Sequence, residues 1–309
     1  MVNECKSAIK NKLSFFLFFD SSIAGIIAPK IFPKCGRPVL CIPVKTLDIF
    51  YFCFIDVKIV DFYLCKVNWL SNILSSLWRL WFLLVFLCTF ILFMPALFLF
   101  STIYENPKYV SYITRYWSKT TLYCSLIFPK IIWEEKLDNN TVYIFCPNHT
   151  STLDIPFIFS IINIPIQFMG KAELTRIPVF GYFFKKNSVI VDRKNLKDSY
   201  SAFKKSAAKL KKGISMCIFP EGGIPRENVF LKKFKNGAFK LACEENIKII
   251  PITIADNKKK FPKSYFKGRP GIIRVTIHKS IDPKNFNTET INNYVYSIIF
   301  EKLKHYENN

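Results

Sequence analysis

Short apolar segments alternate with amphipathic ones from about residue 140 onward. The apolar segments are near-continuous, as expected of buried parallel strands: TVYIFC, IQFMG, SVIVD, ISMCIF, KIIPITI and IIRVTI. The segments between and after them have helical spacing: DIPFIFSII, DSYSAFKKSAAKLKK, GAFKLACEEN and NTETINNYVYSIIFEKLKHY. We expect the second of these helices to have Asp198 as its N-cap and to stop at Gly213. This order predicts an α/β fold with a mainly parallel sheet flanked by helices on both faces.

A long apolar run precedes this region. The 21 residues from Leu80 to Phe100 carry no charge, and about 20 such residues cross the hydrocarbon core of a bilayer. Arg79 flanks the run on one side, and Pro95 inside it is expected to kink the helix. A spanning helix and a re-entrant or half-buried hairpin both fit this pattern.

Aromatic and basic residues are interleaved over residues 103–133. This pattern is typical of a helix lying at the level of lipid headgroups, although an aromatic-rich core helix fits it too. We therefore predict membrane-anchoring, interfacial helices in a hairpin over 71–133, followed by an α/β domain over 134–309. Residues 1–70 hold only short apolar patches broken by charges, and we expect a poorly defined extension or an over-long start of the reading frame.

The composition is both apolar and basic. Hydrophobic residues make up 50% of the 309, and 44 Lys and Arg stand against 22 Asp and Glu, for a net charge of +22. Such a chain suits an anionic partner, namely a membrane surface, a phosphorylated small molecule or nucleic acid, although an AT-rich genome could account for part of the basicity. Most of this charge follows the apolar run, which predicts a membrane protein whose α/β domain faces the cytoplasm.

The ten cysteines are scattered, without a Cys-x-x-Cys pair or metal-ligand spacing. We therefore expect reduced cysteines and no bound metal.

The stretch CPNHTSTLD contains the most distinctive polar pair. His149 follows a predicted buried strand, and Asp154 opens the next predicted helix. A carboxylate at this spacing can hold one imidazole nitrogen and leave the other as a base, and strand ends are where α/β folds place their chemistry. Taken alone, this spacing occurs often by chance, and a polar turn is then slightly favoured over a catalytic pair. A serine nucleophile is not indicated, because no Gly-x-Ser-x-Gly elbow occurs.

Other predicted strand ends carry glycines or cations. Glu221, Gly222 and Gly223 follow one strand, with Lys232, Lys233 and Lys235 close behind. Arg193 ends another strand, and Lys171 and Arg176 follow a third. In a parallel sheet these loops converge on one edge, where glycine turns and cations can bind a phosphate. Each cation by itself is more often a solvated surface charge than a ligand.

Together these motifs resemble a known family. NHTSTLD, KAELTRIPVFG, VIVDR, FPEGG and IIPITI occur in the order and approximate spacing of the four acyltransferase blocks. Over roughly residues 70–270 the chain resembles the membrane-bound 1-acylglycerol-3-phosphate acyltransferases, the PlsC-type lysophosphatidate acyltransferases.

The resemblance implies a role for each matching residue. His149 would be the general base and Asp154 would orient it. Arg193, Lys171 and the turn at Glu221, Gly222 and Gly223 would hold the phosphate-bearing acceptor. In two places the chain departs from the family: EGGIPR stands where the family usually has Glu-Gly-Thr-Arg, and KKNS replaces a glycine before the VIVDR strand.

The implied reaction moves an acyl group from acyl-CoA or acyl carrier protein to the 2-hydroxyl of 1-acylglycerol 3-phosphate, forming phosphatidate in phospholipid biosynthesis. The expected partners are membrane lipid, lysophosphatidate and the acyl donor, without a cofactor and without nucleic acid. Two alternatives remain: an acyltransferase for glycerol 3-phosphate or another lysophospholipid, and a non-catalytic, membrane-tethered basic binding protein. His278 and His305 have no acidic or cysteine neighbour within a few residues, so we expect them to be structural or solvated.

Overall fold

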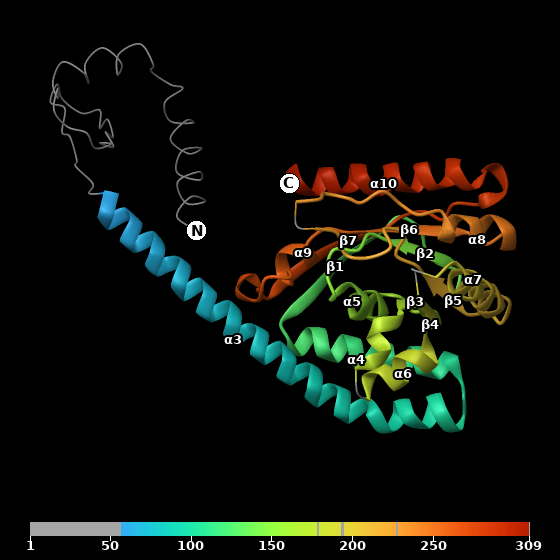
Figure 1. The fold of residues 1–309 in the computed structure, drawn as a ribbon, viewed down its shortest axis with the longest axis horizontal. Helices are drawn as coiled ribbons and strands as arrows, with labels where there is room; N and C mark the ends of the chain where they lie inside the picture. Colours follow the sequence, from blue (N-terminus) through green and yellow to red (C-terminus); the bar gives the residue numbers. More distant parts are fainter. Residues whose placement is uncertain (1–56, 178, 193–194, 227, 309) are drawn as a thin grey trace, which may run out of the picture. The chain divides into compact units, whose positions relative to one another are not determined.

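A seven-stranded sheet forms the centre of the computed structural model (Figure 1), which describes residues 57–308 except 178, 193–194 and 227 and gives side chains from Trp69 onward. Most of the expected N-terminal extension lies outside the described residues. The chain from Trp69 onward is one compact unit.

The strand order is β1-β7-β6-β2-β5-β3-β4. The five strands β6, β2, β5, β3 and β4 are mutually parallel, whereas β7 runs antiparallel to β6 and pairs in parallel with the edge strand β1. The mainly parallel sheet predicted from the sequence is thus confirmed, as are all six predicted strands. The bounds are β1 Ile127–Trp133, β2 Ile144–Pro147, β3 Ile166–Lys171, β4 Val189–Val191, β5 Ser215–Cys217, β6 Ile249–Ile254 and β7 Gly271–Ile277.

The pairing register aligns the carboxyl ends of three central strands. Ile144 of β2 lies opposite Ile249 of β6 and Met216 of β5. Because these strands are parallel, the loops that leave them emerge at the same edge of the sheet. The residues that follow β2, β5 and β6 are therefore brought together from distant parts of the sequence.

Helices cover both faces of the sheet, as Figure 1 shows. Side chains alternate across each strand, so Phe145 and Ile250 pack on one face while Ile144 and Ile249 pack on the other. The first face is covered by α3 (Val57–Phe98), α4 (Pro107–Cys124) and α5 (Asp154–Ile161), and the second by α7 (Leu196–Lys211), α8 (Gly237–Glu245) and α10 (Thr288–Asn308). Two short helices, α6 (Phe180–Asn187) and α9 (Asn257–Lys260), lie between strands.

The start of α7 differs from the sequence prediction. Its N-cap is Asn195, whose side chain accepts a hydrogen bond from the backbone N–H of Lys197, and Asp198 lies within the first turn instead. Asn and Asp cap helices about equally well, so their order in the sequence does not decide between them. Gly213 follows the helix at φ +77°, a left-handed conformation that favours glycine.

The apolar run forms the C-terminal part of a long helix. α3 continues through Pro95 to Phe98, and a π-helical segment at Leu99–Ile103 leads into α4, which Asn106 caps. The two helices pack together, since the hydroxyl groups of Thr89 and Thr121 lie 2.8 Å apart and the indole N–H of Trp117 donates to Thr89. The predicted helical hairpin is present.

The segment Trp69–Ile103 is long and apolar enough to cross a membrane, and its most apolar stretch of 18 residues has a mean hydropathy of 2.7. Many of its leucines, among them Leu80, Leu84 and Leu92, are more than half exposed. An apolar surface of this kind is consistent with membrane association.

The strand β1 was missed by the sequence analysis, which assigned residues 103–133 to a helix. In the structure α4 ends at Cys124, and Ile127–Trp133 pairs along its length with β7. The partner strand lies more than a hundred residues away in the sequence. The aromatic content of the segment therefore did not reveal that it pairs as a strand. The sheet therefore begins inside the segment predicted as membrane-anchoring helices.

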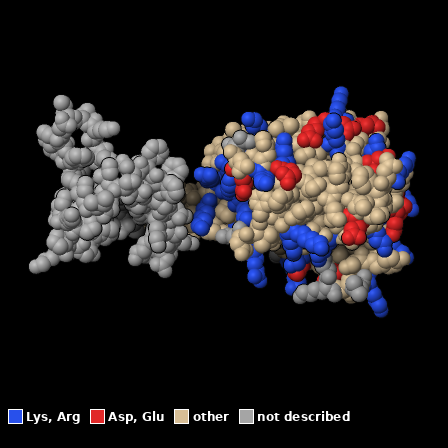
Figure 2. Space-filling model, turned by 90° about the horizontal axis from the view of Figure 1, so that it is seen from above, with Lys and Arg blue, Asp and Glu red and all other residues tan. Residues whose placement is uncertain are grey.

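Charged side chains are spread over the molecular surface. Figure 2 looks down on the side of the sheet that α10 covers, and it shows Lys and Arg interspersed with Asp and Glu and with uncharged residues. The excess of positive charge is thus not gathered into a single patch on this side.

Candidate active site

The loop between β2 and α5 is fixed to the neighbouring strand β6. The amide of Asn148 donates to the carbonyl oxygen of Ile254 at 3.0 Å and accepts from its N–H at 2.7 Å. These two bonds continue the β2–β6 ladder by means of a side chain, and Asn148 is fully buried. The next residue, His149, is thereby held at the carboxyl edge of the sheet.

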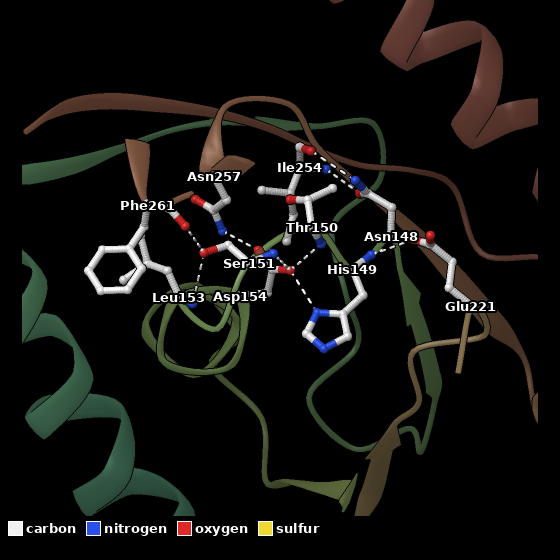
Figure 3. Close-up of polar contacts among 10 residues, drawn as sticks. All are labelled: Asn148, His149, Thr150, Ser151, Leu153, Asp154, Glu221, Ile254, Asn257 and Phe261. Atoms are coloured by element: carbon white, nitrogen blue, oxygen red, sulfur yellow. Dashed lines mark hydrogen bonds and ion pairs between the residues drawn. The ribbon is translucent and has the colours of Figure 1, made fainter. Parts of the chain in front are cut away.

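His149 and Asp154 form a direct hydrogen bond. Nδ1 of His149 lies 2.8 Å from Oδ2 of Asp154 (Figure 3). Because a carboxylate only accepts, Nδ1 carries the proton of the neutral imidazole. The lone pair is therefore on Nε2, which points away from Asp154 in Figure 3. This arrangement makes Nε2 available as a base.

The carboxylate of Asp154 is completely buried and accepts four hydrogen bonds. Besides His149, the backbone N–H groups of Thr150 and Ser151 donate to Oδ2 at 2.6 and 2.9 Å. The side-chain amide of Asn257 donates to Oδ1 at 2.6 Å. All four partners are donors, so together they fix the orientation of the carboxylate.

The imidazole of His149 is largely enclosed. Only 13% of the side chain is exposed, and the ring stacks on Phe219, with a centroid distance of 4.0 Å and an interplanar angle of 18°. Phe219 in turn stacks against Phe168 on the neighbouring strand β3. These contacts, with the bond to Asp154, leave the ring one orientation and a small accessible edge.

Glu221 supports the loop from the adjacent strand end. Its side chain is fully buried, Oε1 accepts from the backbone N–H of His149 at 2.6 Å, and Oε2 accepts from that of Lys232 at 3.1 Å. Burial raises the pKa of this carboxyl to about 7, against the opposing effect of the two hydrogen bonds. Both oxygens contact main-chain amides, so the observed role of Glu221 is to position His149, and its contact with a substrate stays a prediction.

The two glycines after Glu221 have conformations that favour glycine. Gly222 lies at φ +75° and Gly223 at φ +148°. A Cβ atom on residue 222 would lie 2.8 Å from Cε and 3.2 Å from Nζ of Lys235. The ammonium group of Lys235 therefore stands directly over this turn.

The remaining predicted site residues are less constrained. Lys171 ends β3 at the same edge of the sheet, but its Nζ is exposed and forms an ion pair with Glu173 at 2.8 Å. Arg193 lies outside the described residues. The side chains of Lys232 and Lys233 are exposed. The structure thus brings His149, Asp154 and the Glu221 turn together by direct contacts, while substrate binding at Lys171 and Arg193 stays a prediction.

Asn257 was not recognised in the sequence. It opens α9 after β6, where the neighbouring Asp256 accepts two bonds from the guanidinium of Arg274, at 2.9 and 3.0 Å. This ion pair fixes the loop, and the fully buried amide of Asn257 then reaches Asp154. The only available signal was its place after a predicted strand, in a lysine-rich segment that resembles a solvated loop.

A second histidine–carboxylate pair has different properties. Nδ1 of His278 lies 3.1 Å from Glu134, and Nε2 lies 2.8 Å from the hydroxyl of Thr253. Both ring nitrogens are thus engaged, and burial lowers the pKa of His278. This pair supports the prediction that His278 is structural, although its acidic partner is remote in sequence.

Among the described residues, no group of three or more His, Cys, Asp or Glu side chains could hold a metal ion. The site offers an oriented base beside a glycine turn.

The chain is similar in sequence to known acyltransferases. Residues 129–255 match the Acyltransferase family model. A chloroplastic 1-acyl-sn-glycerol-3-phosphate acyltransferase of Arabidopsis thaliana is 31% identical over 56% of this chain and 49% of its own length. The corresponding enzyme of Saccharomyces cerevisiae is 27% identical over 55% of this chain and 56% of its own. The chain thus spans about half the length of these curated relatives.

A solved structure shares the fold. The crystal structure of the 1-acyl-sn-glycerophosphate acyltransferase PlsC from Thermotoga maritima superposes with a TM-score of 0.64 at 22% identity, covering 78% of this chain and 98% of that one. These matches confirm the family resemblance and the fold class predicted from the sequence.

The raised pKa of Glu221 predicts a pH-dependent stability. The pKa of Glu221 is about 7 in the folded protein and 4.5 ordinarily. The folded state therefore holds the carboxyl proton of Glu221 more tightly than the unfolded state does. The free energy of unfolding should therefore fall as the pH rises through about 7, by on the order of 3 kcal/mol. Denaturant titrations between about pH 5 and pH 8 measure this slope. Glu221→Gln should flatten it while lowering stability overall, and an unchanged slope would contradict the assignment.

The contact between Asn257 and Asp154 predicts a positioning role. Asn257→Leu should lower the turnover of any reaction that uses His149 by roughly 10- to 100-fold, because a hydrogen bond to a charged group contributes about 1.5–3 kcal/mol. The pH profile should also shift, since Asp154 then holds the imidazolium less well.

The matched control for this variant is Asn187→Leu. It removes comparable amide bonds, to Ser101 and to the carbonyl of Phe183 in α6, which lie away from the carboxyl edge of the sheet. Equal losses of turnover in the two variants, without a shift of the pH profile, would show that Asn257 is merely structural.

Proposed function

We propose that this protein, whose residues 129–255 form an Acyltransferase-family domain, transfers a fatty acyl group to the 2-hydroxyl of 1-acylglycerol 3-phosphate and so forms phosphatidate. One observation carries the proposal: Nε2 of His149 is an oriented base, held by Asp154 at the carboxyl edge of the sheet beside the Glu221–Gly223 turn. The names of the curated relatives support the choice of acceptor.

The proposed mechanism is direct acyl transfer from a thioester. Nε2 of His149 removes the proton of the acceptor hydroxyl as its oxygen attacks the thioester carbonyl. The resulting imidazolium is stabilised by the buried carboxylate of Asp154. Backbone N–H groups at the strand ends stabilise the oxyanion. The tetrahedral intermediate then expels the thiolate of coenzyme A or acyl carrier protein, which takes up the proton from His149.

The acceptor phosphate is assigned to the region above the glycine turn. Lys235 places its ammonium group there, and Gly222 has no side chain to obstruct an approaching anion. The chain has Ile224 where the family usually has arginine, so a cation from another position is required to neutralise the phosphate. In the described part of the chain, the ammonium group of Lys235 has no carboxylate partner that would compete.

The remaining partners follow from the same chemistry. The apolar segment Trp69–Ile103 associates with the membrane that holds the lipid acceptor, with the α/β domain on the cytoplasmic side. The acyl donor is acyl-CoA or acyl carrier protein, and the reaction requires no metal or redox cofactor, because the thioester supplies the activated carbonyl.

The assignment of His149 predicts a large loss of activity on its removal. His149→Ala should lower kcat/KM by about 1,000-fold or more, since general-base catalysis contributes about 100- to 10,000-fold and the base here has no neighbour to replace it. The assay uses the full chain, labelled lysophosphatidate, glycerol 3-phosphate and other lysophospholipids as acceptors, and both donor types.

The matched control is His278→Gln, which disrupts the other buried histidine–carboxylate pair and should retain activity. Near-normal transfer by His149→Ala would contradict the mechanism, while transfer to a different acceptor would revise only the substrate.

The position of Lys235 predicts its effect on the acceptor. Lys235→Gln should raise the KM for lysophosphatidate by about tenfold, the size expected for one charge-assisted hydrogen bond to phosphate, and should change kcat less. Lys233→Gln removes the same charge from an exposed neighbour and serves as the control. Equal effects of the two substitutions would indicate long-range attraction rather than a phosphate contact at the turn.

A further inference from the structure

A separate cavity lies between α4, β1 and the end of α5. Its volume is about 360 Å³, and its walls are partly apolar and partly polar. Helix α4 supplies two cations and a tyrosine, and β1 supplies a tryptophan. The lining residues are Arg115, Lys119, Tyr123, Pro129, Ile131, Trp133, Ser160, Ile161 and Asn163.

Two cations in this cavity have no counter-ion. Arg115 and Lys119 are four residues apart on α4, hence on the same face of the helix, and both are half-buried. No carboxylate belongs to the lining, and neither cation forms an ion pair in the described part of the chain. In that part of the chain, the buried Nε of Arg115 also has no hydrogen-bond partner. A buried N–H group without an acceptor is unfavourable, and so are two positive charges close together.

The positive charge of Lys119 is disfavoured by its surroundings. Burial and the neighbouring charge of Arg115 both lower the pKa of Lys119. A bound anion would neutralise this repulsion. The cavity thus has the electrostatics of an anion-binding site.

The cavity lies away from His149. α5 begins at the carboxyl edge of the sheet with Asp154 and runs to Ile161, which belongs to the cavity wall. The eight residues of this helix therefore separate the two sites by about 12 Å along its axis. A ligand in the cavity therefore lies too far from His149 to contact it.

The surroundings indicate the kind of anion. Tyr112, Tyr116 and Tyr123 are exposed along α4 beside the two cations, and Trp133 is exposed at the end of β1. Exposed Tyr and Trp next to basic residues are typical of a surface at the level of lipid headgroups. α4 also packs against the exposed apolar helix α3 through Thr121, so the helix that carries the two cations belongs to the same hairpin as the apolar segment.

We propose that Arg115 and Lys119 form a phosphate-binding site, distinct from the acyl-transfer site, that takes the phosphodiester of an anionic lipid headgroup. The guanidinium fork of Arg115 can bind two phosphate oxygens, and the ammonium of Lys119 can bind a third. The amide of Asn163 provides a further donor at the rim of the cavity. The aromatic side chains accommodate the glycerol backbone and the first carbons of the chains.

The test measures binding of short-chain lipids to the full chain in a neutral, phosphate-free detergent. Isothermal titration calorimetry compares dihexanoyl phosphatidylglycerol, dihexanoylglycerol, which lacks the phosphate, and inorganic phosphate. The double variant Arg115→Gln/Lys119→Gln should bind phosphatidylglycerol at least about tenfold more weakly than the wild type, because two charge-assisted contacts are lost. Dihexanoylglycerol should bind both proteins alike.

Two further variants control for charge and folding. Lys197→Gln/Lys212→Gln removes two exposed positive charges from the region of α7, which covers the other face of the sheet, and should bind like the wild type. Arg115→Lys keeps the charge and loses the fork, so its affinity should be intermediate. Thermal unfolding of each variant shows whether it is folded, and no readout depends on acyl transfer.

Three outcomes separate the possibilities. Weaker binding of phosphatidylglycerol by the Arg115/Lys119 variant alone supports the lipid site. Inorganic phosphate that binds the wild type but not this variant, without any difference for the lipid, would leave a phosphate site and overturn the lipid assignment. Equal binding of both ligands by all folded variants would overturn the proposal.

Discussion

The buried carboxylate of Asp154 is the feature on which the active site depends. A buried charge is stable only when its hydrogen bonds are satisfied, and here the donors come from His149, from two backbone amides of the β2–α5 loop and from Asn257. The same bonds that stabilise the charge also shape the loop and orient the imidazole. Catalytic geometry and local stability therefore cannot be changed separately at this position.

The parallel central strands make this arrangement possible, and they also bring two acids near each other. β2, β5 and β6 deliver His149, Glu221 and the Asn257 loop to one edge of the sheet. Asp154 then raises the pKa of Glu221, in addition to the larger effect of burial. Glu221 holds the backbone of His149 and Asp154 holds its ring, so the histidine is supported by two carboxyl groups from different parts of the chain.

Features that depend on local sequence patterns were predicted. Features that depend on contacts between distant segments were missed. Six strands and the His149–Asp154 pair were predicted because apolar runs and a five-residue spacing are local features. The edge strand Ile127–Trp133 depends on β7 for its structure, and Asn257 depends on the Asp256–Arg274 ion pair for its position. Glu221 was recognised as a site residue, but only the structure showed that its carboxyl contacts main-chain amides.

The departure of this chain from the usual Glu-Gly-Thr-Arg block has a structural basis. Residue 223 lies at φ +148°, where a threonine would be strained but a glycine is not. A turn of this conformation therefore favours glycine over threonine at residue 223. The following residue, Ile224, has no charge that could bind a phosphate. Lys235 stands over Gly222, and it is the cation that we propose for the phosphate. Under that proposal, the backbone conformation and the choice of cation are two consequences of one change in sequence.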